Sequence, residues 1–164
     1  MKKLILPVLL FGNFLGAQLF IGRLDKKVQV GVNLQNKAKG IVLSYDKGMG
    51  SNFSLGIVAG YLIDVKEWSG KKADFVDRFN IQGRANANIA EVFGIEDIVD
   101  LYPGLNINLK NFGAHFGIRY FLTKGFGVYS EFQLPIVHYD NHITDVENYN
   151  NQFNFSIGTS FYLD

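Results

Sequence analysis

The stretch FNIQGRANANIA, residues 79–90, alternates between apolar and polar side chains. One side carries Phe79, Ile81, Gly83, Ala85, Ala87 and Ile89, and the other carries Asn80, Gln82, Arg84, Asn86 and Asn88. A period of two is that of a β-strand, in which successive side chains point to opposite faces. The stretch therefore predicts a strand with one apolar and one polar face, and the question is which face points into the protein.

The same alternation recurs along the rest of the chain. It covers the segments 28–35, 41–46, 53–62, 79–90, 99–109, 112–122, 126–134 and 153–163. Strands of roughly ten residues with alternating hydrophobicity, separated by turns, are typical of transmembrane β-barrels. A chain of 164 residues is long enough for one domain of this kind. We therefore expect an all-β fold, an eight-stranded antiparallel up-and-down transmembrane β-barrel.

The N-terminus has the composition of a cleavable signal peptide. Lys2 and Lys3 supply a positive region, an apolar run follows, and Ala17 ends a small-residue cleavage site. The apolar run is shorter than the ~20 residues that a transmembrane helix needs. We therefore expect export, with residues 1–17 removed and residues 18–164 forming the barrel.

The placement of aromatic residues favours lipid on the apolar faces. Aromatic side chains gather near both ends of the strands, as in the two interfacial girdles of outer-membrane barrels. The expected outer girdle is Tyr61, Phe79, Phe112 and Phe153, and the expected periplasmic girdle is Tyr45, Phe53, Tyr120, Phe126 and Phe161. A soluble barrel of the lipocalin kind, with apolar faces inside, gives no reason for two rings. We expect Asn86 in the lumen, and Ala85 and Ala87 facing lipid near the middle of the bilayer.

The lengths of the connections predict how the barrel is oriented. With the mature N-terminus in the periplasm, the long connections 63–78 and 135–152 both fall on the outside. Long external loops and short periplasmic turns are the rule in outer-membrane barrels. An even number of strands then returns the C-terminus to the periplasm.

Three stretches carry a resemblance to known proteins. They are DRFNIQGRANANIA (77–90), DLYPGLNINLKNFGAHFGIRYF (100–121) and GFGVYSEFQLP (125–135). The chain resembles small eight-stranded outer-membrane barrels, the class of the outer-membrane protein A and X barrels. It is most similar to an uncharacterised outer-membrane β-barrel family of flavobacteria and other Bacteroidetes. The resemblance implies the architecture, a place in the outer membrane among lipids and lipopolysaccharide, and contact with the barrel-assembly machinery; it implies no reaction.

Ionisable residues on the predicted lumen face are the first candidate site. They are Arg84, Asp100, His115, Arg119 and Glu131. Buried charges need partners, and eight strands leave a lumen only wide enough for side chains. We interpret the five as a structural network that plugs the barrel; a selectivity filter or a proton path is the alternative. The turn at 123–125 sets Gly117 opposite Glu131, so we expect Arg119 and Glu131 to pair diagonally.

The two long connections hold further candidates. Trp68 lies among Lys66, Lys71 and Lys72, a combination suited to lipopolysaccharide phosphates or a partner, although Trp is also common in the interfacial belt. His138, Asp140 and His142 are followed by two more acidic residues in the last connection. These side chains are possible Zn²⁺ or Ca²⁺ ligands, but their spacing fixes no ligand geometry, and we predict no metal site.

Composition excludes several classes of function. The chain has no Cys, and hence no thiolate nucleophile or thiolate metal site. A formal net charge of +1 without a basic cluster argues against nucleic-acid binding. We expect a monomer without cofactor and without enzymatic activity, in a structural or surface-interaction role. A narrow channel for ions or small solutes, and a lipid-modifying enzyme with Ser, His and a carboxylate, are the alternatives.

Overall fold

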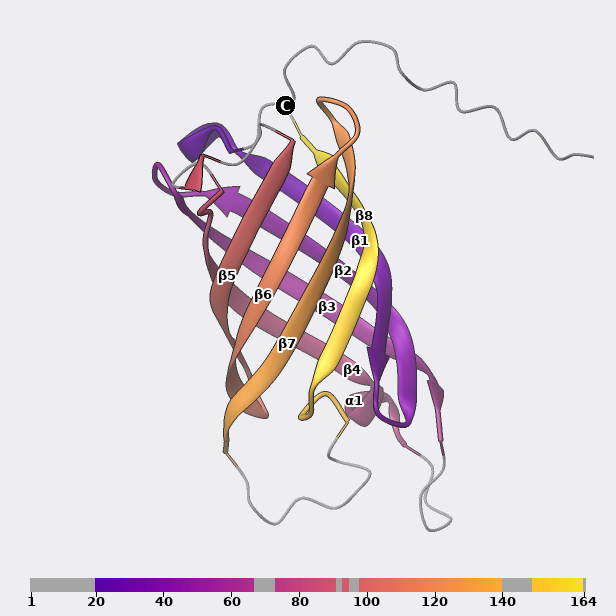
Figure 1. Ribbon diagram of the computed structural model, residues 1–164. Coiled ribbons are helices and arrows are strands. Elements are labelled where there is room, and N and C mark those ends of the chain that lie inside the picture. The colour runs from indigo at the N-terminus through magenta and orange to yellow at the C-terminus, as the bar shows by residue number, and fades with distance from the viewer. Residues whose placement is uncertain (1–19, 67–72, 91–92, 95–97, 140–148, 164) are drawn as a thin grey trace, which may run out of the picture.

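The chain folds into a closed barrel of eight antiparallel strands, arranged in sequence order (Figure 1). The computed structural model describes residues 20–66, 73–90, 93–94, 98–139 and 149–163. The strands are β1 (Lys26–Gln35), β2 (Ala38–Gly48), β3 (Phe53–Val65), β4 (Phe79–Ala87), β5 (Val99–Asn108), β6 (Asn111–Phe121), β7 (Phe126–His138) and β8 (Asn154–Tyr162). The pairing of β1 with β8 closes the sheet. The expected eight-stranded up-and-down barrel is confirmed.

The two ends of the barrel differ in what they carry. We call the end where β1 begins and β8 ends the terminal end, and the opposite end the loop end (Figure 1). The terminal end also carries the short 3₁₀ helix η1 (Gly22–Leu24), and the loop end carries α1 (Phe75–Arg78). The alternation did not predict α1, a single turn that begins with a capping box between Asp74 and Asp77. None of the helices in the described residues is long and apolar enough to cross a membrane.

The strand boundaries follow the alternation closely at most ends. The expected starts at Phe53, Phe79, Val99 and Phe126 are confirmed. β2 and β7 run further than the expected segments: β2 includes Lys39 and Lys47 near its ends, and β7 continues past a register shift through Val137 to His138. β4 instead stops at Ala87, which pairs with Phe53, the first residue of β3. The expectation that Ala87 lies near the middle of the bilayer is therefore wrong; it lies at the terminal end.

The polar face of the opening stretch points into the lumen. Asn86 is completely buried, whereas Ile81 on the opposite face is 49% exposed. The same division holds around the barrel, where buried side chains are mostly Asp, Asn, Gln, Ser and Arg, and exposed ones include many Ile, Leu, Val and Phe. This arrangement is the reverse of a soluble protein and matches a barrel with an apolar outside.

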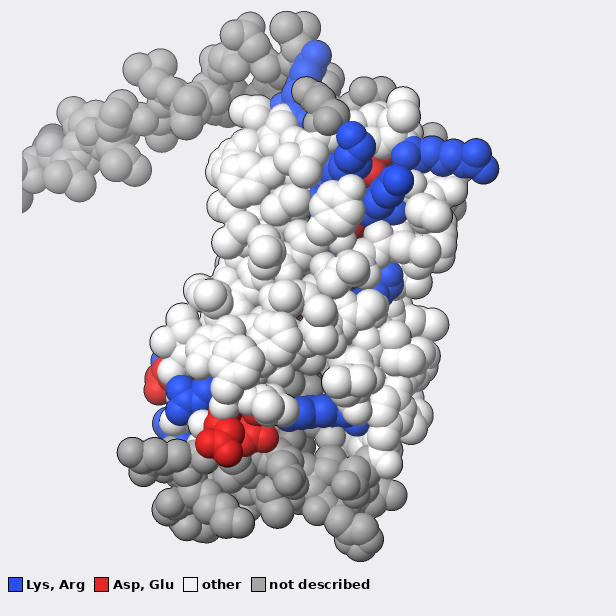
Figure 2. All heavy atoms as spheres, turned by 180° about the vertical axis from the view of Figure 1, so that it is seen from behind, with Lys and Arg blue, Asp and Glu red and all other residues white. Residues whose placement is uncertain are grey.

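Charges on the outer surface lie toward the two ends of the barrel. Figure 2 shows most of the Lys, Arg, Asp and Glu near the two ends, with mostly uncharged residues between them. β2 shows the same distribution of charged and apolar residues along one strand. Its exposed positions are, in order, Lys39, Ile41, Leu43, Tyr45 and Lys47. Rings from the expected girdles make aromatic contacts at each end: Phe126 packs against Phe161, and Phe79 stacks on Phe75 of α1, a residue outside the expected girdles.

Candidate functional site in the barrel lumen

Seven charged side chains form a continuous series of ion pairs inside the barrel. We call this series the lumen chain; in order of contact it is Asp25, Lys27, Asp100, Arg119, Asp46, Arg84 and Glu131. All seven residues are at most 6% exposed. They alternate in sign from the terminal end inward, so each buried charge has an opposite charge beside it, which is what a desolvated lumen requires.

Arg84 lies at the centre of the interactions. Its Nε and Nη2 donate to the two carboxylate oxygens of Asp46 at 2.7 and 2.6 Å, and its Nη1 donates to Glu131 at 2.7 Å. Nη2 also donates to the side-chain oxygens of Gln29, at 2.7 Å, and Ser44, at 3.0 Å. A planar guanidinium has five N–H donors in a fixed fork, and this arrangement engages all three of its nitrogens.

Arg119 lies between two carboxylates of the lumen chain, those of Asp100 and Asp46. Its Nη1 donates to Asp100 at 2.8 Å, its Nη2 donates to Asp46, and its guanidinium carbon lies 3.6 Å from the ring centre of Tyr102. A guanidinium over an aromatic face is a cation–π contact. Asp100 is the residue directly opposite Arg119 in the β5–β6 ladder, so this pair follows from the strand register.

The expected diagonal pair of Arg119 and Glu131 is wrong, although the register behind it is confirmed. Gly117 pairs with Glu131, as expected from the turn. The space beside Gly117 is taken by the Tyr102 ring, which a Cβ at position 117 would overlap. Arg119 therefore binds Asp100 and Asp46, and Glu131 binds Arg84 instead.

His115 joins the lumen chain through an amide. Its Nε2 lies 2.7 Å from Oδ1 of Asn86, whose Nδ2 donates to Asp46 at 3.1 Å and to Ser54 at 3.0 Å. Because an amide oxygen can only accept, Nε2 carries the proton in this arrangement. Nδ1 of His115 is buried without a hydrogen-bond partner among the described residues. His115 thus orients Asn86 and has no direct contact with a carboxylate of the lumen chain in the described hydrogen bonds.

Glycines leave the room that these side chains occupy. Asp46, Gly56 and Arg84 lie in one row across β2, β3 and β4. A Cβ at Gly56 would overlap Oδ1 of Asp46 and come within 2.7 Å of the Tyr45 carbonyl oxygen. Glycine between the two strands therefore allows the ion pair to reach across an intervening strand.

The lumen toward the loop end contains amides in place of charges. Oε1 of Gln82 accepts from Asn106 at 3.3 Å and from Gln133 at 2.9 Å, and Asn154 donates to Gln133 at 2.8 Å. Among the described residues, no buried charge lies beyond Glu131 in this direction. The lumen is thus divided into a charged half and a neutral hydrogen-bonded half.

Residues 149–151, which precede β8, close the loop end. Tyr149 packs against Ala38 and Leu62, and its hydroxyl donates to the carbonyl of Lys66 at 2.6 Å. Asn111 donates to the side chain of Asn151 at 2.8 Å. Asn151 is almost fully buried, so these residues occupy the mouth of the barrel and do not stand in solvent.

Residues before β1 close the terminal end. Asp25 accepts from Lys27 at 2.5 Å and from the backbone N–H of Ile21 at 3.3 Å, and Nζ of Lys27 lies 5.0 Å from the ring centre of Phe20. Burial raises the pKa of the Asp25 carboxyl above its usual value, although the neighbouring Lys27 opposes that shift. The lumen chain therefore begins at a buried plug made by the segment that precedes the barrel.

The structure brings together most of the predicted lumen residues and adds three. Arg84, Asp100, Arg119 and Glu131 belong to the lumen chain, and His115 lies beside it. The sequence analysis left out Asp25, Lys27 and Asp46. Asp46 and Lys27 fall on the inward side of their strands by the same alternation that identified Arg84.

The candidates in the long connections lie mostly outside the described residues. Trp68, Lys71, Lys72, Asp140 and His142 are of this kind, as is the expected signal peptide. Lys66 is exposed, and its backbone N–H donates to Lys37 at 3.0 Å; His138 is exposed at the end of β7. Within the part of the chain that the structure describes, no group of three His, Asp or Glu side chains is placed to hold a metal ion.

Comparison with known proteins supports the fold. The solution NMR structure of Outer Membrane Protein G from Pseudomonas aeruginosa is similar, with a TM-score of 0.50 and 12% sequence identity over 85% of this chain and 97% of that one. This likeness agrees with the class of small outer-membrane barrels, and at such identity it concerns the fold alone; the closer resemblance to a flavobacterial family stays a prediction. No curated protein matches the chain. A family model matches residues 10–163, and the chain therefore belongs to the family of unknown function DUF6646.

Proposed function

We propose that this protein is an integral outer-membrane β-barrel with a plugged lumen and a structural or surface-interaction role, not a catalytic one. The observation that carries the proposal is the lumen chain, which links six of the eight strands through buried ion pairs. The similar fold of an outer-membrane protein supports the same reading.

The dimensions of the outer surface support a bilayer around the barrel. Lys39 and Lys47 of β2 are eight residues apart, which is roughly 20 Å along the membrane normal for a strand tilted by about 45°. Lysine side chains at the two ends can extend their ammonium groups further toward water. The apolar stretch between them is thus close to the ~25 Å apolar band of outer-membrane barrels.

The contacts inside the lumen support a plug in preference to a channel. Arg84 and Arg119 keep their protons at all ordinary pH values, so a series that passes through both guanidinium groups is not a proton relay. Each is held by carboxylates, and moving either aside would leave buried charges unpaired at a cost of several kcal/mol. Tyr149 and Asn151 at the loop end add a second closure.

We further propose an orientation and a surface role for the connections. Residues 1–17 act as a signal peptide, the C-terminus faces the periplasm, and the barrel-assembly machinery inserts the chain as a monomer. Trp68 with Lys66, Lys71 and Lys72 then lies at the cell surface, where the lysines bind lipopolysaccharide phosphates. The support is the length of this connection and its lysine content.

Electrical recording in planar bilayers tests the plug. Refolded wild-type protein should give no steady conductance above the lipid baseline. Replacing both Asp46 and Arg84 with Ala removes the central ion pair and should produce conductance if the barrel still closes. Steady single-channel steps from wild-type protein, at a level that this double variant does not change, would contradict the proposal.

A second experiment tests the surface role and the location. Outer-membrane fractions should contain the protein, with faster migration in unboiled samples, since closed barrels resist detergent unfolding. Lys66, Lys71 and Lys72 replaced together by Ala should reduce lipopolysaccharide co-purification. The matched control is Lys124→Ala, a lysine in the turn at the terminal end. Equal lipopolysaccharide retention in the two variants would rule out the lysine contact.

A further inference from the structure

The neutral half of the lumen is closed by four residues that precede β8. We call Tyr149, Asn150, Asn151 and Gln152 the lid. The first three are at most 8% exposed, so they are set into the mouth of the barrel. Asn150 has a left-handed backbone conformation, with a φ of 63°, a region that asparagine enters more readily than most residues. The lid is therefore a defined piece of backbone seated in the mouth.

Hydrogen bonds hold the lid to the surrounding wall. The side chain of Gln35 accepts from the backbone N–H of Asn150 at 3.0 Å and donates to the side chain of Asn150 at 2.9 Å. Gln152 donates to the carbonyl of Asn36 at 2.8 Å, and Asn150 donates to the carbonyl of Asp77 at 3.3 Å. All four lid side chains are uncharged. The lid can thus lift without separating an ion pair, because water can replace each of these bonds.

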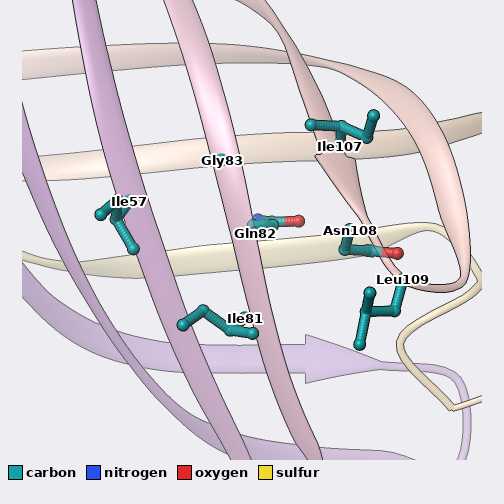
Figure 3. A pocket seen from close by; sticks show the side chains of 7 residues that line it. All are labelled: Ile57, Ile81, Gln82, Gly83, Ile107, Asn108 and Leu109. Carbon is teal, nitrogen blue, oxygen red and sulfur yellow. The ribbon is translucent and has the colours of Figure 1, made fainter.

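The lumen wall next to the lid is uncharged as well. The side-chain oxygen of Gln82 accepts from Asn106 and Gln133. Figure 3 shows Gln82 on β4 near Asn108, the residue with which it pairs on β5. Among the described residues, no buried charge lies beyond Glu131 in this half. Water that enters from the loop end therefore meets amides, with which it can exchange hydrogen bonds.

Solvent already reaches the inward side of the strands at this end. On β1 the inward side chains of Lys27 and Gln29 are buried, whereas those of Asn33 and Gln35, further toward the loop end, are partly exposed. The inward side chain of Asn80, at the loop end of β4, is partly exposed in the same way. The boundary between solvent and the neutral half thus lies at the lid.

Two buried polar atoms favour opening of the lid. Oδ1 of Asn106 on the wall and Nδ2 of Asn151 on the lid have no hydrogen-bond partner among the described residues, and the two residues are 3% and 1% exposed. A buried donor and a buried acceptor without partners destabilise the closed form, since water would bond to both. The charged half also holds such an atom, Oγ of Ser160, but opening that half would separate ion pairs such as Lys27 with Asp25.

We propose that the lid opens the neutral half to solvent at the loop end, as a dead-end compartment for small uncharged polar molecules. This inference rests on the proposed plug, because the lumen chain stays closed beneath the compartment. Arg84 and Glu131, paired at 2.7 Å, form its floor. Amide walls donate and accept hydrogen bonds, which suits hydroxyl and amide groups and leaves an ion without a counter-charge. The interior of an eight-stranded barrel can hold one small ligand.

Cysteine labelling of the refolded protein in detergent micelles tests the proposal, since the chain has no cysteine of its own. Asn106→Cys places a thiol in the neutral half and Ser160→Cys places one in the charged half, both at buried positions. Asn36→Cys, at an exposed turn of the loop end, gives the reference rate. Methyl methanethiosulfonate, a small uncharged reagent, should modify Asn106→Cys at least about tenfold faster than Ser160→Cys, which corresponds to about 1.4 kcal/mol.

Loosening the lid should raise the rate in the neutral half alone. Tyr149→Phe removes the hydroxyl that donates to the carbonyl of Lys66, and should speed the modification of Asn106→Cys about fivefold, as expected for one hydrogen bond. Tyr139→Phe is the matched control, an exposed tyrosine at the other end of the same connection, and should leave this rate unchanged. Neither substitution should change the rate of Ser160→Cys.

A charged reagent tests the kind of molecule that the compartment admits. The anionic sulfonatoethyl methanethiosulfonate, with its rate scaled to that of Asn36→Cys, should react with Asn106→Cys more slowly than the uncharged reagent does. Equal scaled rates would overturn the preference for uncharged molecules. If Asn106→Cys fails to fold, Asn154→Cys, buried at the loop end of β8, reports on the same half.

The outcomes separate this inference from the proposed function. A barrel without conductance in which Asn106→Cys reacts as slowly as Ser160→Cys would overturn the compartment alone. An unchanged rate of Asn106→Cys with Tyr149→Phe would likewise overturn the role of the lid. Equally fast modification of both cysteines would show a lumen that is open along its whole length, and would overturn the plug as well.

Discussion

The guanidinium of Arg84 donates two hydrogen bonds, of 2.7 and 2.6 Å, to the two carboxylate oxygens of Asp46. They belong to β4 and β2, which are not neighbours; Gly56 of β3 lies between them in the same row. A bidentate pair of this kind is among the stronger polar interactions in proteins, and it depends on geometry as well as charge.

Gly56→Ala should destabilise the barrel by about 2–4 kcal/mol, because the added methyl group overlaps Asp46 and displaces it from Arg84. The measurement is urea unfolding of the refolded protein in detergent or lipid. Gly60→Ala is the matched control, since it lies on the same strand and its Cβ would meet only the Ile41 carbonyl oxygen, at 3.6 Å. Equal losses from both substitutions would mean that Gly56 has no special part in the ion pair.

A pair of double-mutant cycles should identify the partner of Glu131. Arg84→Gln and Glu131→Gln should show a coupling energy of about 1–3 kcal/mol, since the two side chains are in direct contact. The cycle of Arg119→Gln with Glu131→Gln should give a clearly smaller value, because Arg119 binds Asp46 and Asp100. A larger coupling energy for Arg119 than for Arg84 would show instead that Arg119 is the partner of Glu131, as the strand register alone suggests.

Leu43→Arg should prevent assembly, because it places a charge at the centre of the apolar band, where arginine costs about 2–4 kcal/mol. Leu43 is 52% exposed and lies midway along β2. The control is Ile63→Arg, which is similarly exposed at 60% but lies near the loop end of β3, where the cost falls to about 0–1 kcal/mol. Folding yield into lipid vesicles measures both. Normal yield for Leu43→Arg together with a defect for Ile63→Arg would place the membrane elsewhere.

Titration of Asp25 should make the stability of the closure at the terminal end depend on pH. Because the pKa of Asp25 is raised in the folded protein, its contribution to stability is fully present below the unfolded value of about 3.9 and is lost as pH rises through the folded value. The stability of wild type relative to Asp25→Asn should therefore decrease as pH rises above about 4. Urea unfolding of both proteins across that range gives the difference, and an increase with pH would contradict the raised pKa.

The strands could be predicted from the sequence because the membrane and the lumen impose opposite polarity on alternate residues. Asn86 and Ile81 show this division in the structure as they do in the sequence. The ends of β2 and β7 were less predictable. Charged residues, Lys39 and Lys47, lie near the ends of β2, and a register shift against β6 interrupts the alternation near the end of β7. The single turn of α1 is too short for a hydrophobic period to reveal.

The partners inside the lumen depend on contacts that cross the barrel, and strand register alone does not fix them. Register places Asp100 beside Arg119, and that pair forms. It says nothing of Tyr102, whose ring fills the space beside Gly117 and covers Arg119. Asp46 was predictable as an inward residue, but its role between two arginines follows only from the closed barrel.

The lumen chain also bears on how the protein can assemble. Lys27, Asp46, Arg84, Asp100, Arg119 and Glu131 come from six different strands, so most of these charges obtain their partners only when the sheet has curled and β1 has met β8. A half-formed sheet in hydrocarbon would hold unpaired charges, each costing several kcal/mol. Insertion and closure are therefore coupled into one cooperative event, and partly inserted intermediates should be too rare to observe.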